Sequence, residues 1–240
     1  MLQYRIYLLG AVMLLSTMLE AQKKSSNPPE DLGHCYFYHH TSLADARSDL
    51  QLMKHVEGLN LKKGEKVADI GAGALRWEGA LSLFTENVQF YAVDLDSSCC
   101  NPQQASYVHK YYSIVKGKRL SNSISTSVGS IKRTGLPDAQ MDKVILFQTF
   151  HEFSHPEDML RDIYRSLNQN GRLYISELVP RHAKELHPGC QHRMFWPEEL
   201  KKLVQRYGFV FDVQTTIVKD DKQNHTQLLV AGSSVKLISA

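Results

Sequence analysis

The 240-residue sequence predicts an α/β protein with a seven-stranded, mostly parallel β-sheet and helices on both faces. Three observations support this prediction. Strand-like apolar runs alternate with segments of helical periodicity from residue 65 onward. Two final strand-like segments have no helix between them, so they should pair as an antiparallel C-terminal hairpin. The length also suits one domain with a large buried core.

The predicted strands are apolar or β-branched runs bounded by turn residues, and they cover residues 65–71, 88–96, 122–130, 142–150, 171–179, 209–218 and 225–233. The predicted helices carry apolar residues at helical spacing, and they cover residues 42–59, 75–86, 102–118, 156–171 and 197–208. Ser42 is a candidate N-cap of the first helix. Pro102 and Pro156 begin two others, as proline commonly does at the first helical position.

The N-terminal segment contains an apolar run from Ile6 to Leu19. Its length fits the hydrophobic core of a signal peptide and is short for a membrane span. We therefore expect residues 1–21 to be a signal peptide, cleaved after Ala21, or a membrane anchor; a buried N-terminal helix is the alternative. Residues 22–41 would form a linker and lid, and residues 42–240 the folded domain. This predicts an exported (periplasmic or secreted) or membrane-anchored protein of undetermined orientation.

Charge and cysteine content exclude some functions. A net charge of +3 is too small to indicate nucleic-acid binding, so we expect no nucleic-acid partner. We also expect a monomer. The four cysteines include no C-x-x-C pair, which excludes a zinc ribbon. A Cys35–Cys190 disulfide would fit an oxidising compartment, but unpaired thiols fit the spacing equally well.

The segment VADIGAGALRW, residues 67–77, joins the first strand to the next helix. Gly71 and Gly73 would permit a tight turn and let a ligand approach the backbone. Asp94 ends the second strand, where a carboxylate can accept hydrogen bonds from ribose hydroxyls. Asp69, just before the loop, would repel a pyrophosphate, and Arg76 stands where a dinucleotide fingerprint needs glycine or alanine. These residues favour a positively charged adenosyl ligand over a dinucleotide.

Four segments, VADIGAG, YAVDLD, and residues 135–153 and 155–180, together resemble the class I S-adenosylmethionine-dependent methyltransferases. The resemblance covers roughly residues 42–233 and is to the small-molecule branch, of the type 11/25 kind. It implies a Rossmann-like fold, S-adenosyl-L-methionine as cofactor and a small-molecule methyl acceptor. The cofactor-binding residues that it implies are Asp69, Gly71, Gly73, Asp94, Leu95, Gly129, Ser130, Phe147 and Gln148.

Two residues depart from the family pattern. Ser130 stands where the family often has an aspartate that contacts the adenine amino group, and Leu75 stands where its loop often has a third glycine. Leu75 should face the start of the helix more than the ligand. The alternative to an active methyltransferase is a catalytically inactive adenosyl-ligand-binding protein.

Candidate acceptor-side residues follow the fourth and fifth strands. His151 is a candidate general base, with Glu152 beside it, although a purely structural role for His151 is the alternative. His187, His192 and Arg193 are candidate acceptor-binding residues. The spacing H-x-x-C-x-H in this loop matches no established metal site, so no metal ligands are predicted. Ring-bearing residues that would form a lid over the cofactor are His34, Tyr36, Tyr38, His39 and His40.

Overall fold

In the computed structural model, the described residues are residue 35, residues 40–220 and residues 225–234, with side chains described up to residue 211. The chain divides into two compact units, residues 1–36 and 37–240, and the sheet lies in the second. The predicted signal peptide or anchor, the linker and most of the lid lie outside the described residues. Within the described part of the chain, no helix is long and apolar enough to cross a membrane.

The sheet follows the order β3-β2-β1-β4-β5-β7-β6. Its strands are β1 (Lys66–Ile70), β2 (Gln89–Asp94), β3 (Ser123–Val128), β4 (Met141–Phe147), β5 (Leu167–Val179), β6 (Phe209–Asp220) and β7 (His225–Ser234). The strands β1 to β5 run parallel, and β7 pairs antiparallel with both β5 and β6. The prediction of an α/β fold with a parallel sheet is therefore confirmed. The parallel part comprises β1 to β5, and the antiparallel C-terminal pair extends it beyond β5.

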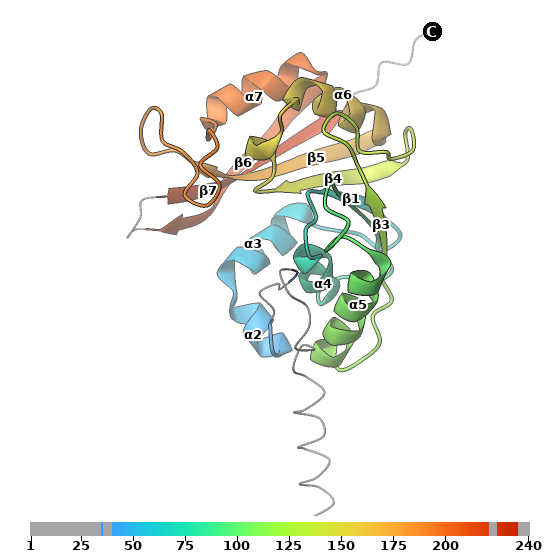
Figure 1. Cartoon of the computed structure of the whole chain (residues 1–240). Helices are drawn as coiled ribbons and strands as arrows, with labels where there is room; N and C mark the ends of the chain where they lie inside the picture. The colour runs from blue at the N-terminus through green and yellow to red at the C-terminus, as the bar shows by residue number, and fades with distance from the viewer. Residues whose placement is uncertain (1–34, 36–39, 221–224, 235–240) are drawn as a thin grey trace, which may run out of the picture. The chain divides into compact units, whose positions relative to one another are not determined.

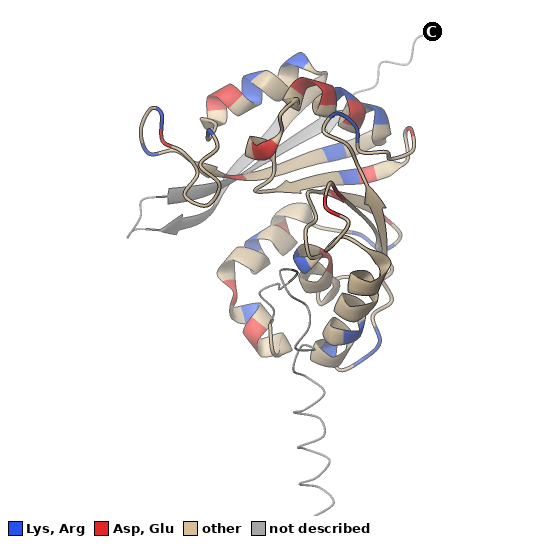
Figure 2. Ribbon diagram, in the orientation of Figure 1, with Lys and Arg blue, Asp and Glu red and all other residues tan. Residues whose placement is uncertain are grey.

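Helices cover both faces of the sheet (Figure 1). They are α2 (Leu43–Ser48), α3 (Leu50–Leu59), α4 (Arg76–Ser82), α5 (Pro102–Lys116), α6 (Pro156–Ser166) and α7 (Pro197–Arg206). In Figure 1, α2 to α5 lie on one face and α6 and α7 on the other. Successive strand residues point to opposite faces of the sheet, so there are two cores. Val67 packs in the core beneath α4 and α5, and Ala68 packs in the core beneath α6 and α7. Basic and acidic residues are interspersed along α6 and α7 (Figure 2).

The predicted helix over residues 42–59 is two helices, because Asp49 is extended and starts a new one. Its carboxylate accepts a hydrogen bond from the Leu52 N–H at 3.0 Å, the contact expected of an N-cap. The same carboxylate pairs with His40 Nε2 at 2.9 Å. His40, the described member of the predicted lid, is thus buried against the first helices. Ser42 caps α2 as predicted.

The boundary between α6 and β5 also differs from the prediction, which extended the helix to residue 171. The helix ends at Ser166, whose hydroxyl donates back to the Ile163 carbonyl at 2.8 Å, and β5 begins at Leu167. The pairing between β4 and β5 is irregular here, with Leu167 opposite Met141 and Arg172 opposite Lys143. The intervening residues 168–171 form an irregular stretch that sequence periodicity did not detect.

Cys100 and Cys190 carry free thiols, so the Cys35–Cys190 disulfide considered from sequence does not form. Cys100 is buried, and burial raises the pKa of its thiol to about 12. The Cys190 thiol is partly exposed in the loop between β5 and α7.

Candidate functional site

A cavity of about 550 Å³ lies at the carboxyl ends of the parallel strands, the usual ligand position in open α/β sheets. Its volume is within the range of roughly 300–1,000 Å³ typical of small-molecule sites. Most of the predicted cofactor-binding residues line it, namely Gly71, Gly73, Asp94, Leu95, Gly129, Ser130, Phe147 and Gln148. Asp69 is the exception.

The loop after β1 is shaped by backbone conformation. Gly71 has φ +80°, and its N–H donates to the Val93 carbonyl at 2.8 Å. A Cβ atom at Gly71 would lie 2.2 Å from Thr149 Cγ2, so a side chain here would displace the start of the next loop. Gly73 has φ +51°, and its N–H donates to Asp94 Oδ2 at 2.7 Å. The glycines therefore bring β1, β2 and β4 together around the cavity.

Leu75, which replaces the family's third glycine, has φ +64° and is the N-cap residue of α4. Its side chain is fully buried in the core beneath α4 and does not line the cavity. The prediction that this residue faces the helix start is therefore confirmed. Burial of the leucine side chain offsets the cost of about 1–2 kcal/mol that a left-handed conformation carries for a non-glycine residue.

Asp69, which the resemblance implies as a cofactor-binding residue, lies away from the cavity. Asp69 is 1% exposed and does not line the cavity; it shares the buried face of β1 with Val67. Burial, followed by the nearby carboxylates of Glu78 and Asp94, raises the pKa of Asp69 well above its usual value. Burial also raises the pKa of Glu78 to about 8. These two acids form a buried carboxyl pair beneath the glycine loop.

The outer wall of the cavity combines one carboxylate with apolar surface. Asp94 Oδ1 accepts a hydrogen bond from the Asp96 N–H at 2.9 Å, so the carboxylate is fixed by two backbone donors. Leu95 and Ile131, which flank it in the cavity wall, are 58% and 50% exposed. An acceptor for hydroxyls beside two exposed apolar side chains suits a ribose carrying a flat base.

Ser130 lines the cavity, but its hydroxyl is already engaged in its own turn. The oxygen accepts from the Arg133 N–H at 3.0 Å and from the Lys132 N–H at 3.4 Å. Serine here closes a turn, as serine commonly does. It therefore does not simply replace an aspartate that reaches for a ligand.

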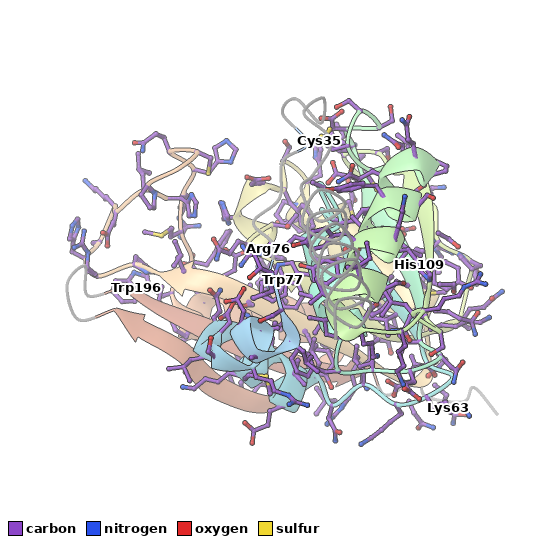
Figure 3. The ribbon with its side chains drawn as sticks, turned by 90° about the horizontal axis from the view of Figure 1, so that it is seen from below. Cys35, Lys63, Arg76, Trp77, His109 and Trp196 are labelled. Atoms are coloured by element: carbon purple, nitrogen blue, oxygen red, sulfur yellow. The ribbon has the colours of Figure 1, made fainter. Side chains whose placement is uncertain are left out.

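The inner wall is aromatic. The Phe147 ring lies 4.2 Å from the Trp77 ring and 4.7 Å from the His55 ring, measured between centroids. Trp77 follows Arg76 at the start of α4, and the two side chains lie close together (Figure 3). Burial lowers the pKa of His55 to about 4, so this ring is neutral at neutral pH.

The loop after β4 holds His151 behind the cavity wall. The His151 side chain is 1% exposed and Glu152 is the neighbour that lines the cavity. His151 Nδ1 lies 2.7 Å from Glu177 Oε2, and Glu177 Oε1 accepts from the Phe150 N–H at 2.7 Å. Burial opposes protonation of His151, but the hydrogen bond to Glu177 outweighs it and raises the pKa to about 9. His151 does not line the cavity, and its role as a general base stays a prediction.

The other predicted acceptor-side residues, His187, His192 and Arg193, lie in three different places. His192 lines the cavity. His187 stacks on His151, with ring centroids 4.3 Å apart. Arg193 forms an ion pair with Glu199 and lies over the Phe195 ring, and it does not line the cavity.

Comparison with known proteins agrees with this geometry. Residues 68–175, which extend from β1 into β5, match the sequence profile of a methyltransferase domain family. The chain has the class I S-adenosylmethionine-dependent methyltransferase fold. The predicted resemblance to the class I methyltransferases is thus confirmed, and the small-molecule acceptor stays a prediction. No curated protein matches the chain.

Solved structures with this methyltransferase fold are distant in sequence. An S-adenosylmethionine-dependent methyltransferase from Aquifex aeolicus is 20% identical, with a TM-score of 0.58 over 89% of this chain and 97% of that one. Phosphoethanolamine N-methyltransferase 2 of Haemonchus contortus, in complex with S-adenosyl-L-methionine, is 13% identical, with a TM-score of 0.57 over 78% and 52%. The [4+2]-cyclase SpnF is 15% identical, with a TM-score of 0.59 over 82% and 84%.

Several residues that line the cavity were missed from sequence: Ile70, Val93, Ile131, Arg133, Thr134, Thr149, Phe153, Ser154 and Met159. Most of them adjoin a predicted residue in the chain, so widening each motif by a few residues would have found them. Glu177, which holds His151, gave no such signal because it lies near the end of another strand.

Proposed function

We propose that the protein is an S-adenosylmethionine-dependent methyltransferase acting on a small-molecule acceptor. The observation that supports it most is the cavity, in which the glycine loop, Asp94 and the apolar Leu95 and Ile131 meet at the carboxyl ends of β1 and β2. Asp94 would bind the ribose hydroxyls and the two apolar side chains would contact the adenine faces.

The methionine part of the cofactor would occupy the inner side, against Gly71, Phe147 and Gln148. Methyl transfer requires chiefly that the acceptor and the sulfonium methyl be held in line and close together. Glu152 and His192 line the remaining part of the cavity, where they would contact the acceptor. Asp69, buried beneath the loop, would support the loop's conformation without contacting the cofactor.

Calorimetric titration of the full chain with S-adenosylmethionine and with its demethylated product tests the cofactor assignment. We expect micromolar binding that is weakened at least about tenfold, or about 1.4 kcal/mol, by Asp94→Ala. Asp96→Ala is the matched control, because Asp96 is an exposed acid two residues away and does not line the cavity. Equal affinity of wild type and Asp94→Ala, or preferential binding of a dinucleotide, would contradict the proposal.

Turnover decides between an enzyme and an inactive binder. Wild-type protein that binds S-adenosylmethionine should form the demethylated product when supplied with the correct class of small acceptor. Binding without turnover across acceptors bearing amine, thiol, hydroxyl and acidic-carbon groups would favour the inactive alternative.

The location of the protein is a separate proposal. We propose export or membrane anchoring by residues 1–21, which lie outside the described residues, on the evidence of the apolar run from Ile6 to Leu19. Mass determination of the mature protein should find a chain that starts at Gln22 if the segment is cleaved. Cell fractionation that finds the intact chain free in the cytoplasm would contradict both export and anchoring. The oligomeric state is a further proposal, and light scattering should find a monomer.

A further inference from the structure

Three side chains with metal-ligating atoms meet beside the acceptor side of the cavity. His151 follows β4, whereas His187 and Cys190 come from the loop between β5 and α7. The nitrogen or sulfur atoms that these residues offer all lie within 4.8 Å of one another. His151 is far from His187 and Cys190 in the sequence, so the fold brings it to them.

The His151 ring is oriented as a metal-binding histidine is. Nδ1 is held by the Glu177 carboxylate at 2.7 Å, which leaves Nε2 as the free ring nitrogen. Nε2 is buried and has no hydrogen-bond partner among the described residues; the Glu152 carboxylate lies 3.9 Å away. A histidine that donates one N–H to a carboxylate and directs its other nitrogen to a metal ion is a recurrent arrangement.

His187 and Cys190 face each other across a tight turn. His187 Nδ1 lies 3.3 Å from Cys190 Sγ, close to the roughly 3.5 Å that nitrogen and sulfur ligands have around tetrahedral zinc. The N–H groups of Gly189 and Cys190 point to the same Nδ1 at 3.3 and 3.4 Å. Because backbone N–H groups only donate, Nδ1 presents its lone pair to the turn that carries the thiol.

We propose that His151, His187 and Cys190 bind a divalent metal ion of the zinc class, with Glu177 orienting His151. One thiolate and two imidazoles suit zinc better than magnesium or calcium, which prefer oxygen ligands. Binding would require the ligand atoms to approach one another by roughly 1 Å, a change that the loop carrying His187 and Cys190 can supply. Three protein ligands leave a fourth position open, as in catalytic zinc sites. That position would lie near Glu152 and His192, which line the cavity.

Zinc binding can be measured without the cofactor, so the result does not depend on the proposed function. The full chain, purified without reductant, is titrated with Zn²⁺ in competition with a chromophoric chelator, and with Co²⁺ to detect thiolate-to-cobalt charge-transfer absorption. We expect one equivalent of zinc, with affinity lowered at least tenfold by Cys190→Ser and by His151→Gln, and no charge-transfer band in Cys190→Ser.

The chain offers a matched control for each ligand type. Cys100→Ser removes the other free thiol, which is buried and has a raised pKa. His182→Gln removes an exposed histidine of the same loop that is outside the three-residue cluster. Both variants should retain wild-type zinc affinity, and circular dichroism should show that all four variants are folded.

Absence of stoichiometric zinc binding in folded wild-type protein would overturn the proposal. So would unchanged affinity in both Cys190→Ser and His151→Gln, or a loss in His182→Gln that equals the loss in those variants. If zinc binds as expected while S-adenosylmethionine does not, the metal site stands and the proposed methyltransferase function fails.

Discussion

The cofactor end of the cavity is shaped by backbone conformation, whereas the acceptor end is built by side chains that hold one another. At the first end, Gly71, Gly73, Leu75 and Gln148 all have positive φ, and backbone N–H groups fix Asp94. At the second, Glu177 holds His151, and His151 stacks on His187. A substitution at the first end therefore acts through strain and a new Cβ, and one at the second through lost charge and hydrogen bonds.

Leu75 gives the largest expected effect on stability at the cofactor end. Leu75→Ala should lower the free energy of unfolding by about 2–5 kcal/mol, because a fully buried leucine is lost and the left-handed conformation remains. Leu75→Gly should be less damaging by about 1 kcal/mol, although it removes one more carbon, because glycine adopts this conformation without strain. Urea denaturation measures both. A glycine variant less stable than the alanine variant would show that Leu75 is not left-handed in solution.

Gly71 and Gly73 separate the effect of backbone strain from that of a clash. Gly71→Ala should cost about 2–4 kcal/mol and abolish cofactor binding, since it combines positive φ with a Cβ 2.2 Å from Thr149. Gly73→Ala is the matched control: it carries positive φ but meets no atom within 4 Å, so about 1–2 kcal/mol is expected. Denaturation and calorimetry on both variants give the two quantities. Equal losses would mean that the Thr149 contact has no effect.

These two ends were not equally predictable from the sequence. Gly71, Gly73 and Asp94 carry local signals, because a glycine-rich turn and an acid at a strand end can each be recognised within a few residues. Asp69 was predicted to bind the cofactor, but strand periodicity could have shown that its side chain points elsewhere. Successive strand residues point to opposite faces of the sheet, so Asp69 shares the face of Val67, which packs in the core beneath α4.

The acceptor end could not be predicted by spacing within one loop. We considered the three residues of the H-x-x-C-x-H pattern together as a possible metal site, but the cluster that the fold forms does not include His192. His151 comes from the loop after β4 and its partner Glu177 lies 26 residues away. Such long-range pairs follow from strand order, which sequence periodicity does not give. The α6–β5 boundary was missed because residues 168–171 are polar and fit a helix end or an irregular strand equally well.

Glu177 tests the view that side-chain contacts shape the acceptor end. Glu177→Gln should lower the free energy of unfolding by about 1–3 kcal/mol, because the buried His151 N–H loses its charged acceptor. Zinc affinity, where zinc binds, should fall about 10–100-fold. The matched control is Glu152→Gln, whose side chain is 51% exposed and should change stability by less than about 0.5 kcal/mol. Urea denaturation of both variants measures these changes. Equal losses of unfolding free energy would contradict a special role for Glu177.

The buried carboxyl pair beneath the glycine loop makes the cofactor end sensitive to pH. Glu78 has a pKa of about 8 in the folded chain and an ordinary value of 4.5 when exposed. Between these values the folded state holds a proton that the unfolded state has lost. Stability should therefore fall as pH rises from about 5 to 8, with a slope of at most about 1.4 kcal/mol per pH unit from this group.

Glu78→Gln keeps the shape of this side chain but cannot ionise, so its stability should fall less steeply over the same pH range. Urea denaturation of wild type and variant at pH 6, 7 and 8 measures the difference in slope. Glu86→Gln is the matched control, because Glu86 is an exposed acid that pairs with Lys118 at the surface. Parallel pH profiles for wild type and Glu78→Gln would mean that the pair is ionised at neutral pH. In that case Asp69 would carry a charge beneath the loop that contacts the proposed cofactor, and backbone shape alone would not account for this end of the cavity.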